Sequence, residues 1–183
     1  MIQLIIFLVC SGLLLVVSWR SLFKPRSHGF YRFLAWEAIL ALIILNAAVW
    51  FHDPFSWYQL ISWLLLLISL VLLVLGVQQL RRMGEPNQEK RTEPELLAFE
   101  KTTRLVTSGI YRYIRHPLYS SLLLLNWGTF FKDISLLGEL LAIITTFFLI
   151  LTAKADEVEC VQTFGIDYQE YMKRTKMFIP YIF

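Results

Sequence analysis

The sequence predicts an all-α integral membrane protein with about five transmembrane helices and a cytosolic C-terminal helix. Three observations support this fold class. First, 57% of the 183 residues are hydrophobic and the mean hydropathy is +0.58, whereas a soluble domain has roughly 45–50% apolar residues. Second, long apolar runs alternate with short polar segments. Third, nearly all Lys and Arg residues fall in alternate polar segments, as cytosolic loops require.

The apolar runs are the predicted transmembrane helices. The first is taken as a mature span and not a signal peptide, because no basic residue precedes it and no small-x-small cleavage site follows it. Most runs approach or exceed the ~30 Å hydrocarbon core when helical, whereas residues 118–131 reach only about 21 Å. The predicted spans are residues 2–19, 33–51, 57–80, 118–131 and 134–152.

The distribution of basic residues predicts the orientation in the membrane. The segments after the first and third spans, together with the C-terminal tail, contain all but one of the 17 Lys and Arg residues. Only Lys132 lies on the other side, so the N-terminus is expected outside and the three basic segments in the cytosol. The expected single membrane domain comprises three N-terminal spans (1–80), a cytosolic loop (81–117), a helical hairpin (118–153) and a C-terminal helix with its tail (154–183).

The end of the cytosolic loop holds the densest group of polar side chains. Residues 105–119 contain Arg112, Arg115 and His116 together with three tyrosines, and an apolar run follows. Pro117 fits the first turn of a helix because no backbone N–H is needed there. The segment therefore predicts a polar loop that turns into a membrane helix. A basic anchor on lipid headgroups is the alternative interpretation.

A second polar group begins the predicted C-terminal helix with the pair Asp156 and Glu157. The hairpin between the two groups is short, so this acidic pair is expected to approach Arg115 and His116 at the cytosolic surface. The alternative is a snorkelling carboxylate at a helix start, where the macrodipole favours acids. The residues that share a helical face with Glu157 are Val161, Phe164, Tyr168 and Tyr171.

The composition argues against several other kinds of site. Cys10 and Cys160 are far apart in the sequence, so neither a disulfide framework nor a metal site is indicated. The basic residues flank apolar spans and form no separate basic face, which excludes nucleic acid as a partner. Asn46 and Asn126 are expected to form hydrogen bonds between helices, and Glu37 is expected to reach the membrane interface.

The order and spacing of the polar residues resemble a known group of membrane enzymes. The residues that carry the resemblance are Gly109-Ile110-Tyr111-Arg112, Arg115-His116-Pro117-Leu118-Tyr119, Asp156-Glu157, Phe164-Gly165, Tyr168, Tyr171 and Pro180. They are similar to the isoprenylcysteine carboxyl methyltransferase and phospholipid methyltransferase superfamily. The resemblance covers residues 99–180 and implies a methyltransferase at the cytosolic membrane face. It also implies S-adenosyl-L-methionine as cofactor and a lipidic or lipid-anchored acceptor.

The resemblance further implies roles for individual residues. The expected catalytic residues are His116, Arg115 and Glu157. The expected cofactor contacts are Thr103, Arg104, Leu105, Val106, Tyr111, His116, Pro117, Leu118, Tyr119, Asp156 and Glu157. Carboxylates suit the amino and sulfonium charges of the cofactor, His or Arg suits its carboxylate, and apolar walls suit its adenine. The reaction needs no metal.

Thr152 departs from the pattern of the isoprenylcysteine enzymes, which have an arginine there for the carboxylate of the acceptor. An isoprenylcysteine carboxylate is the first acceptor that the resemblance implies, and a phospholipid amine is the alternative. Leu118 stands where related NADPH-dependent sterol reductases tend to have asparagine, which argues against a reductase. A non-enzymatic protein, such as a small transporter subunit, would leave Arg115, His116 and Glu157 without a role.

Overall fold

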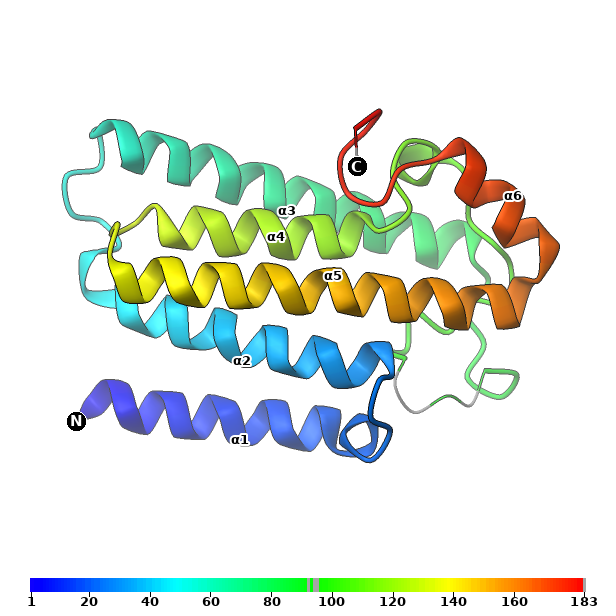
Figure 1. Ribbon diagram of the computed structural model, residues 1–183, viewed down its shortest axis with the longest axis horizontal. Coiled ribbons are helices and arrows are strands. Elements are labelled where there is room, and N and C mark those ends of the chain that lie inside the picture. Colours follow the sequence, from blue (N-terminus) through cyan, green and yellow to red (C-terminus); the bar gives the residue numbers. More distant parts are fainter. Residues whose placement is uncertain (92, 94–95, 183) are drawn as a thin grey trace.

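The computed structural model describes residues 1–91, 93 and 96–182. In these residues α1 to α5 lie side by side as a bundle, and α6 crosses one end of it (Figure 1). Along the bundle α1 packs on α2, α2 on α5, α5 on α4 and α4 on α3. The helices are α1 Ile2–Leu22, α2 His28–Asn46, α3 Trp57–Met83, α4 Pro117–Phe130, α5 Leu136–Phe164 and α6 Ile166–Arg174, with 3-10 turns η1 Ala47–Val49 and η2 Gly109–Arg112.

Four of these helices are long and apolar enough to cross a membrane: α1, α2 with η1, α3 and α5. The most apolar stretch of each of these helices has a mean hydropathy between 1.8 and 2.9. The helices also expose large aliphatic side chains that lipid can cover. The prediction of an all-α integral membrane protein is therefore confirmed. The fourth predicted span is helical as well, but α4 has only 14 residues and reaches about 21 Å, less than the ~30 Å core.

The C-terminal helix differs from the prediction. The fifth span was expected to lead directly into a C-terminal helix over residues 153 to about 174, and α5 does continue without a break past the membrane segment, but it ends at Phe164. No helix breaker lies between the two parts, so the intrahelical hydrogen bonds continue. The break falls at Gly165, which adopts φ of +61°, a conformation that glycine reaches without steric cost. The short helix α6 then crosses the end of the bundle.

Polar side chains inside the bundle tie neighbouring helices together. Asn46 Nδ2 on α2 donates to the carbonyl oxygen of Thr129 at 2.7 Å, and Asn126 Nδ2 on α4 donates to that of Ala142 at 3.0 Å. Both asparagines therefore bond between helices as predicted, in surroundings where an unpaired amide would be unfavourable. Glu37 lies against α1, where it accepts a hydrogen bond from a serine hydroxyl at 3.0 Å.

The short helix α4 leaves a recess between its two long neighbours. α4 begins beside Gly76 of α3, where an added Cβ would lie 2.8 Å from Leu118 Cδ2. From this level α3 continues to Met83 and α5 continues to Phe164, which extends each of them roughly 10 Å beyond the start of α4. The polar loop after α3, the helix α6 and the C-terminal tail lie at this end of the bundle (Figure 1).

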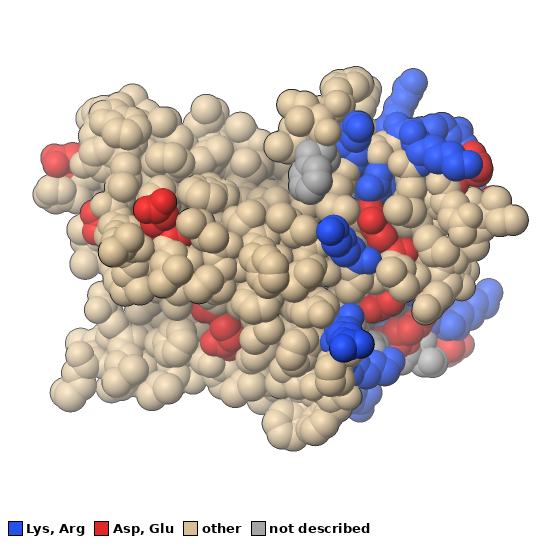
Figure 2. Space-filling view, viewed as in Figure 1, with Lys and Arg blue, Asp and Glu red and all other residues tan. Residues whose placement is uncertain are grey.

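Charged side chains mark the two ends of the bundle. Lys and Arg gather at the end that carries α6, whereas only acidic side chains are coloured at the other end of the visible face (Figure 2). Lys132, the exception noted in the sequence, lies in the turn after α4 and is buried there. Its Nζ donates to Gln59 Oε1 at 3.0 Å and lies 3.2 Å from the centre of the Trp63 ring. The α6 end is thus the basic end of the molecule.

Candidate functional site

A pocket occupies the recess beyond the start of α4. Its walls come from the ends of α3 and α5, the loop after α3, the start of α4 and the helix α6. Three carboxylates, three cationic or imidazole side chains and a wall of aromatic and aliphatic groups line it. The lining residues are Leu80, Arg91, Leu96, Glu100, Thr102, Leu105, Val106, Tyr111, Arg115, His116, Pro117, Leu118, Tyr119, Asp156, Glu159, Cys160, Phe164, Tyr168 and Tyr171.

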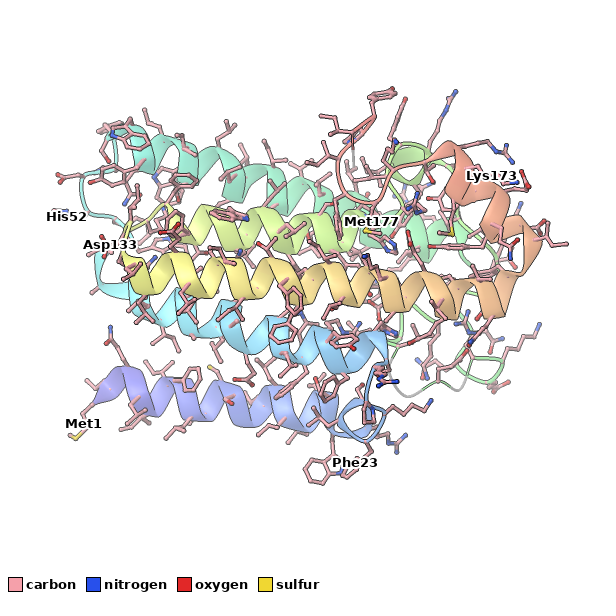
Figure 3. The ribbon with its side chains drawn as sticks, in the orientation of Figure 1. Met1, Phe23, His52, Asp133, Lys173 and Met177 are labelled. Atoms are coloured by element: carbon pink, nitrogen blue, oxygen red, sulfur yellow. The ribbon has the colours of Figure 1, made fainter. Side chains whose placement is uncertain are left out.

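His116 lies immediately before α4 and is only 5% exposed. Its ring stacks on Tyr119 with centroids 5.3 Å apart, and Phe178 from the tail covers another side at 6.3 Å. The backbone N–H of His116 donates to the carbonyl oxygen of Met177 at 3.1 Å, and Figure 3 shows Met177 beside the start of α4. The C-terminal tail therefore holds the imidazole in place.

Two carboxylates face the ring of His116. Its Nδ1 lies 3.4 Å from Asp156 Oδ2, and its Nε2 lies 3.5 Å from Glu157 Oε1. Burial by itself would lower the pKa of His116, but the interactions with these two carboxylates outweigh burial and raise the pKa above its ordinary value. The two carboxylates therefore favour the imidazolium form more than water would for a free histidine. Within the described residues, Nε2 is buried and has no hydrogen-bond partner.

Arg115 is held by contacts on two sides. Its Nε donates to Glu157 Oε1 at 2.7 Å, and one terminal nitrogen lies 2.6 Å from the same oxygen. The other terminal nitrogen donates to the carbonyl oxygens of Met172 and Thr175 at the end of α6, where a cation is favoured by the helix dipole. Arg115 thus joins α5 to α6. Arg115 and Glu157 also neutralise each other's charge.

The acidic pair divides between two surroundings because successive helical residues point about 100° apart. Glu157 turns toward Arg115 and does not line the pocket. Asp156 lines the pocket and its side chain is 20% exposed. Among the described residues it has no ion pair with Lys or Arg; its polar neighbours are His116 and, at 3.7 Å, Cys160 Sγ. Asp156 therefore keeps capacity to accept hydrogen bonds from a ligand.

Three tyrosines line one side of the pocket: Tyr111 from the loop, and Tyr168 and Tyr171 from α6. The Tyr171 hydroxyl donates to the carbonyl oxygen of Tyr111 at 2.6 Å, which fixes α6 against the loop. Burial raises the pKa of Tyr111, of Tyr168 and of Tyr171. These phenols therefore stay protonated at physiological pH, so they can donate hydrogen bonds and offer ring faces, but they cannot act as bases.

Three predicted cofactor contacts do not line the pocket: Glu157, which turns toward Arg115, and Thr103 and Arg104. Thr103 donates its hydroxyl to the carbonyl oxygen of Glu85 at 2.9 Å. Arg104 has a side chain that is 66% exposed and lies 3.7 Å from Glu85 Oε1, and it lines a separate surface cavity. Of the predicted contacts, the structure gathers Leu105, Val106, Tyr111, His116, Pro117, Leu118, Tyr119 and Asp156 in the pocket, with Arg115 beside them.

Two further carboxylates line the pocket, Glu100 and Glu159, which were not predicted from the sequence and are both paired with α2. Arg32 donates to both oxygens of Glu100, at 2.8 and 3.1 Å, and His28 Nδ1 lies 2.6 Å from Glu159 Oε2. Each pair joins segments that are distant in the sequence, so no local spacing could reveal it. The available signal was the presence of His28 and Arg32 at the basic start of an apolar span.

The apolar helices define an all-α integral membrane protein, and a polar pocket lies at the basic end of its helix bundle. The family described as "Protein of unknown function (DUF1295)" matches residues 16–175. The chain therefore belongs to this family.

Relatives with assigned names add to this result. Methanethiol S-methyltransferase of Crocosphaera subtropica is 29% identical over 126 residues, which cover 67% of this chain and 44% of that protein. Methanethiol S-methyltransferase 1 of Bradyrhizobium diazoefficiens is 29% identical over 79 residues, 43% of this chain and 27% of that protein. A probable protein-S-isoprenylcysteine O-methyltransferase of Oryza sativa subsp. indica is 26% identical over 125 residues, 66% of this chain and 63% of that protein.

The matched region spans less than half the length of these methanethiol S-methyltransferases. The similarity to a protein named as an isoprenylcysteine methyltransferase confirms the resemblance that the polar motifs indicated.

Proposed function

We propose that this protein is a membrane methyltransferase that binds S-adenosyl-L-methionine in the pocket beyond α4. The observation that carries the proposal is Asp156, a pocket carboxylate without an ion pair to Lys or Arg among the described residues. Such a carboxylate suits the ammonium or sulfonium group of the cofactor. The imidazolium of His116 suits its carboxylate, and the wall of Tyr111 and Val106 suits its adenine. The names of the relatives support the same reaction class.

The bound cofactor supplies a methyl group activated by the adjacent sulfonium. The protein contributes position and exclusion of water, which are the main requirements of an in-line displacement. His116 and Tyr119 at the start of α4 are buried against the tail, so water is kept from that side. Arg115 and Glu157 contribute indirectly, because their ion pair joins α5 to α6 and so fixes two walls of the pocket. No step requires a metal ion.

The acceptor that we propose is apolar and carries a thiol nucleophile. Thr152 is fully buried and its hydroxyl donates to the carbonyl oxygen of Phe148 at 2.8 Å. Lys154 is exposed and Arg115 is already paired with Glu157, so neither of these two cations is placed to receive a carboxylate at this position. Burying an unpaired carboxylate costs several kcal/mol, which disfavours an isoprenylcysteine carboxylate. Two relatives named for a thiol acceptor support this preference.

The pocket lies at the basic end of the bundle, so we propose that it faces the cytosol. The start of α4 lies about 10 Å below the ends of α3 and α5. That depth would place Leu118 near the acyl boundary, within reach of an acceptor dissolved in the bilayer.

The proposal is tested by offering labelled S-adenosyl-L-methionine to the purified protein with three acceptors in parallel: a short alkyl thiol, a farnesylated cysteine with a free carboxylate, and phosphatidylethanolamine. We expect transfer to the thiol. Asp156→Asn should lower kcat/KM roughly tenfold or more, because a charge-assisted hydrogen bond contributes about 1.5–3 kcal/mol. The matched control is Asp133→Asn, at the opposite end of the bundle (Figure 3), which should leave transfer unchanged.

Labelling of the farnesylated cysteine or of phosphatidylethanolamine in place of the thiol would refute the proposed acceptor while keeping the cofactor. Absence of transfer to all three acceptors by correctly folded protein would contradict the methyltransferase proposal itself.

A further inference from the structure

The first turn of α2 contacts one wall of the pocket through an ion pair. His28 Nδ1 lies 2.6 Å from Glu159 Oε2, and the backbone N–H of His28 donates to Glu159 Oε1 at 3.0 Å. The two residues are 131 positions apart in the chain. Glu159 belongs to α5, in the stretch that carries Asp156 and Cys160 along the pocket wall. One carboxylate is therefore held by two donors from another helix.

The two partners differ in exposure. The side chain of His28 is 1% exposed, whereas that of Glu159 is 34% exposed, and only Glu159 lines the pocket. Each carboxylate oxygen has two acceptor positions, and the contacts with His28 use one position on each. Glu159 thus keeps capacity to accept further hydrogen bonds, in an orientation that the buried imidazole fixes.

A second observation in the same pocket also indicates a ligand. His116 is nine-tenths buried or more and lines the pocket, yet its Nε2 has no hydrogen-bond partner within the described part of the chain. Buried polar atoms are seldom left without a partner. The nearest carboxylate oxygen to this Nε2 is Glu157 Oε1 at 3.5 Å. Beside His116 the pocket offers acceptors at Asp156 and Glu159, which a ligand with donor groups would satisfy.

We propose that Glu159 is a ligand-binding residue of this pocket and that His28 is a positioning residue that acts through it. The inference rests on the proposed cofactor. The group that Glu159 takes is a hydrogen-bond donor of an S-adenosyl compound, either the ribose hydroxyls or the ammonium group, since a carboxylate only accepts hydrogen bonds. A carboxylate that holds ribose hydroxyls is a common solution in nucleotide sites.

A purely structural ion pair between α2 and α5 is the competing explanation. Such a pair would change stability without changing which ligand groups are recognised. Ligand affinity measured on folded protein separates the two explanations, because only a binding role couples His28 to the ligand through Glu159.

The experiment is calorimetric titration of the full-length protein in detergent micelles with two ligands. S-adenosylhomocysteine has both the ribose and the ammonium group, whereas methylthioadenosine keeps the ribose and lacks the amino-acid part. The variants are Glu159→Gln, His28→Ala, His28→Asn and the double variant Glu159→Gln/His28→Ala. Asparagine can place an amide N–H near the position of Nδ1, so His28→Asn is the conservative replacement. Asp133→Asn is the control.

We expect Glu159→Gln to weaken S-adenosylhomocysteine roughly tenfold or more, as loss of a charge-assisted hydrogen bond does. His28→Ala should weaken it as well, His28→Asn should restore most of the affinity, and the double variant should match Glu159→Gln alone. An equal loss for methylthioadenosine assigns Glu159 to the ribose, and a loss confined to S-adenosylhomocysteine assigns it to the ammonium group.

Several results would overturn the inference. One is wild-type affinity of Glu159→Gln for both ligands, and another is a further loss when His28→Ala is added to Glu159→Gln. If Glu159→Gln does not fold, Glu159→Asp keeps the charge but shortens the side chain, and unchanged affinity in that variant would refute the inference. If wild-type protein binds neither ligand, the proposed function fails together with this inference, whereas wild-type binding with an insensitive Glu159 refutes this inference alone.

Discussion

His116 combines a raised pKa with a buried ring nitrogen, Nε2, that has no hydrogen-bond partner among the described residues. Burial opposes its charge, but Asp156 and Glu157 stand within 3.5 Å of its two ring nitrogens and favour the imidazolium. The same charge that suits an anionic group of a ligand also stabilises the fold, because it offsets the repulsion between the two carboxylates.

This residue gives the protein a pH-dependent stability. The folded-state pKa of His116 lies above the ordinary value of 6.5, so its stabilising contribution is complete below that value and is lost as the pH rises through the folded-state pKa. The unfolding midpoint of wild-type protein in detergent should therefore fall as the pH is raised from about 6 to about 9, and His116→Gln should lose this part of the slope. The control variant His52→Gln, in an exposed loop, should keep the pH dependence of wild-type protein. Identical slopes in His116→Gln and wild type would show that His116 is not charged.

At the scale of the elements, the pocket exists because α4 is short and lies close to α3. Gly76 allows this approach, since a Cβ there would meet Leu118 Cδ2 at 2.8 Å. Leu118 in turn lines the pocket. Helix contacts in membranes rely on small residues of this kind, because lipid gives little hydrophobic driving force between helices.

Gly76→Val should therefore lower the free energy of unfolding by about 1–3 kcal/mol, the usual effect of overpacking, and should also displace Leu118. Gly12→Val on α1 is the matched control, because nothing lies within 4 Å of a Cβ at that position. The measurement is unfolding in mixed micelles with both variants in parallel. Equal stability of the two variants would contradict the close contact between α3 and α4.

At the scale of the whole molecule, the apolar runs were sufficient to predict the helices, because a membrane requires long apolar segments with internal hydrogen bonds. It was harder to predict where α5 ends. The charged stretch after residue 152 was expected to stay helical to about residue 174, yet Gly165 ends the helix. The motif around His116 could be found from the sequence because its residues are close together in the chain.

The second half of the pocket could not be predicted in the same way. His28 meets Glu159 and Arg32 meets Glu100 across 131 and 68 positions of sequence. Helical periodicity places a residue on a face but does not specify which other helix that face meets. The split between Asp156 and Glu157 likewise depends on where Arg115 lies, which only the folded chain shows.

Calorimetric titration of the purified protein tests most directly whether the pocket beyond α4 holds S-adenosyl-L-methionine. The ligands are S-adenosylhomocysteine and, separately, NADPH. We predict saturable binding of S-adenosylhomocysteine that Asp156→Asn weakens roughly tenfold or more and that Asp133→Asn leaves unchanged, with no binding of NADPH. Binding of NADPH without binding of S-adenosylhomocysteine, or an Asp156→Asn variant that titrates like wild type, would contradict this assignment of the pocket.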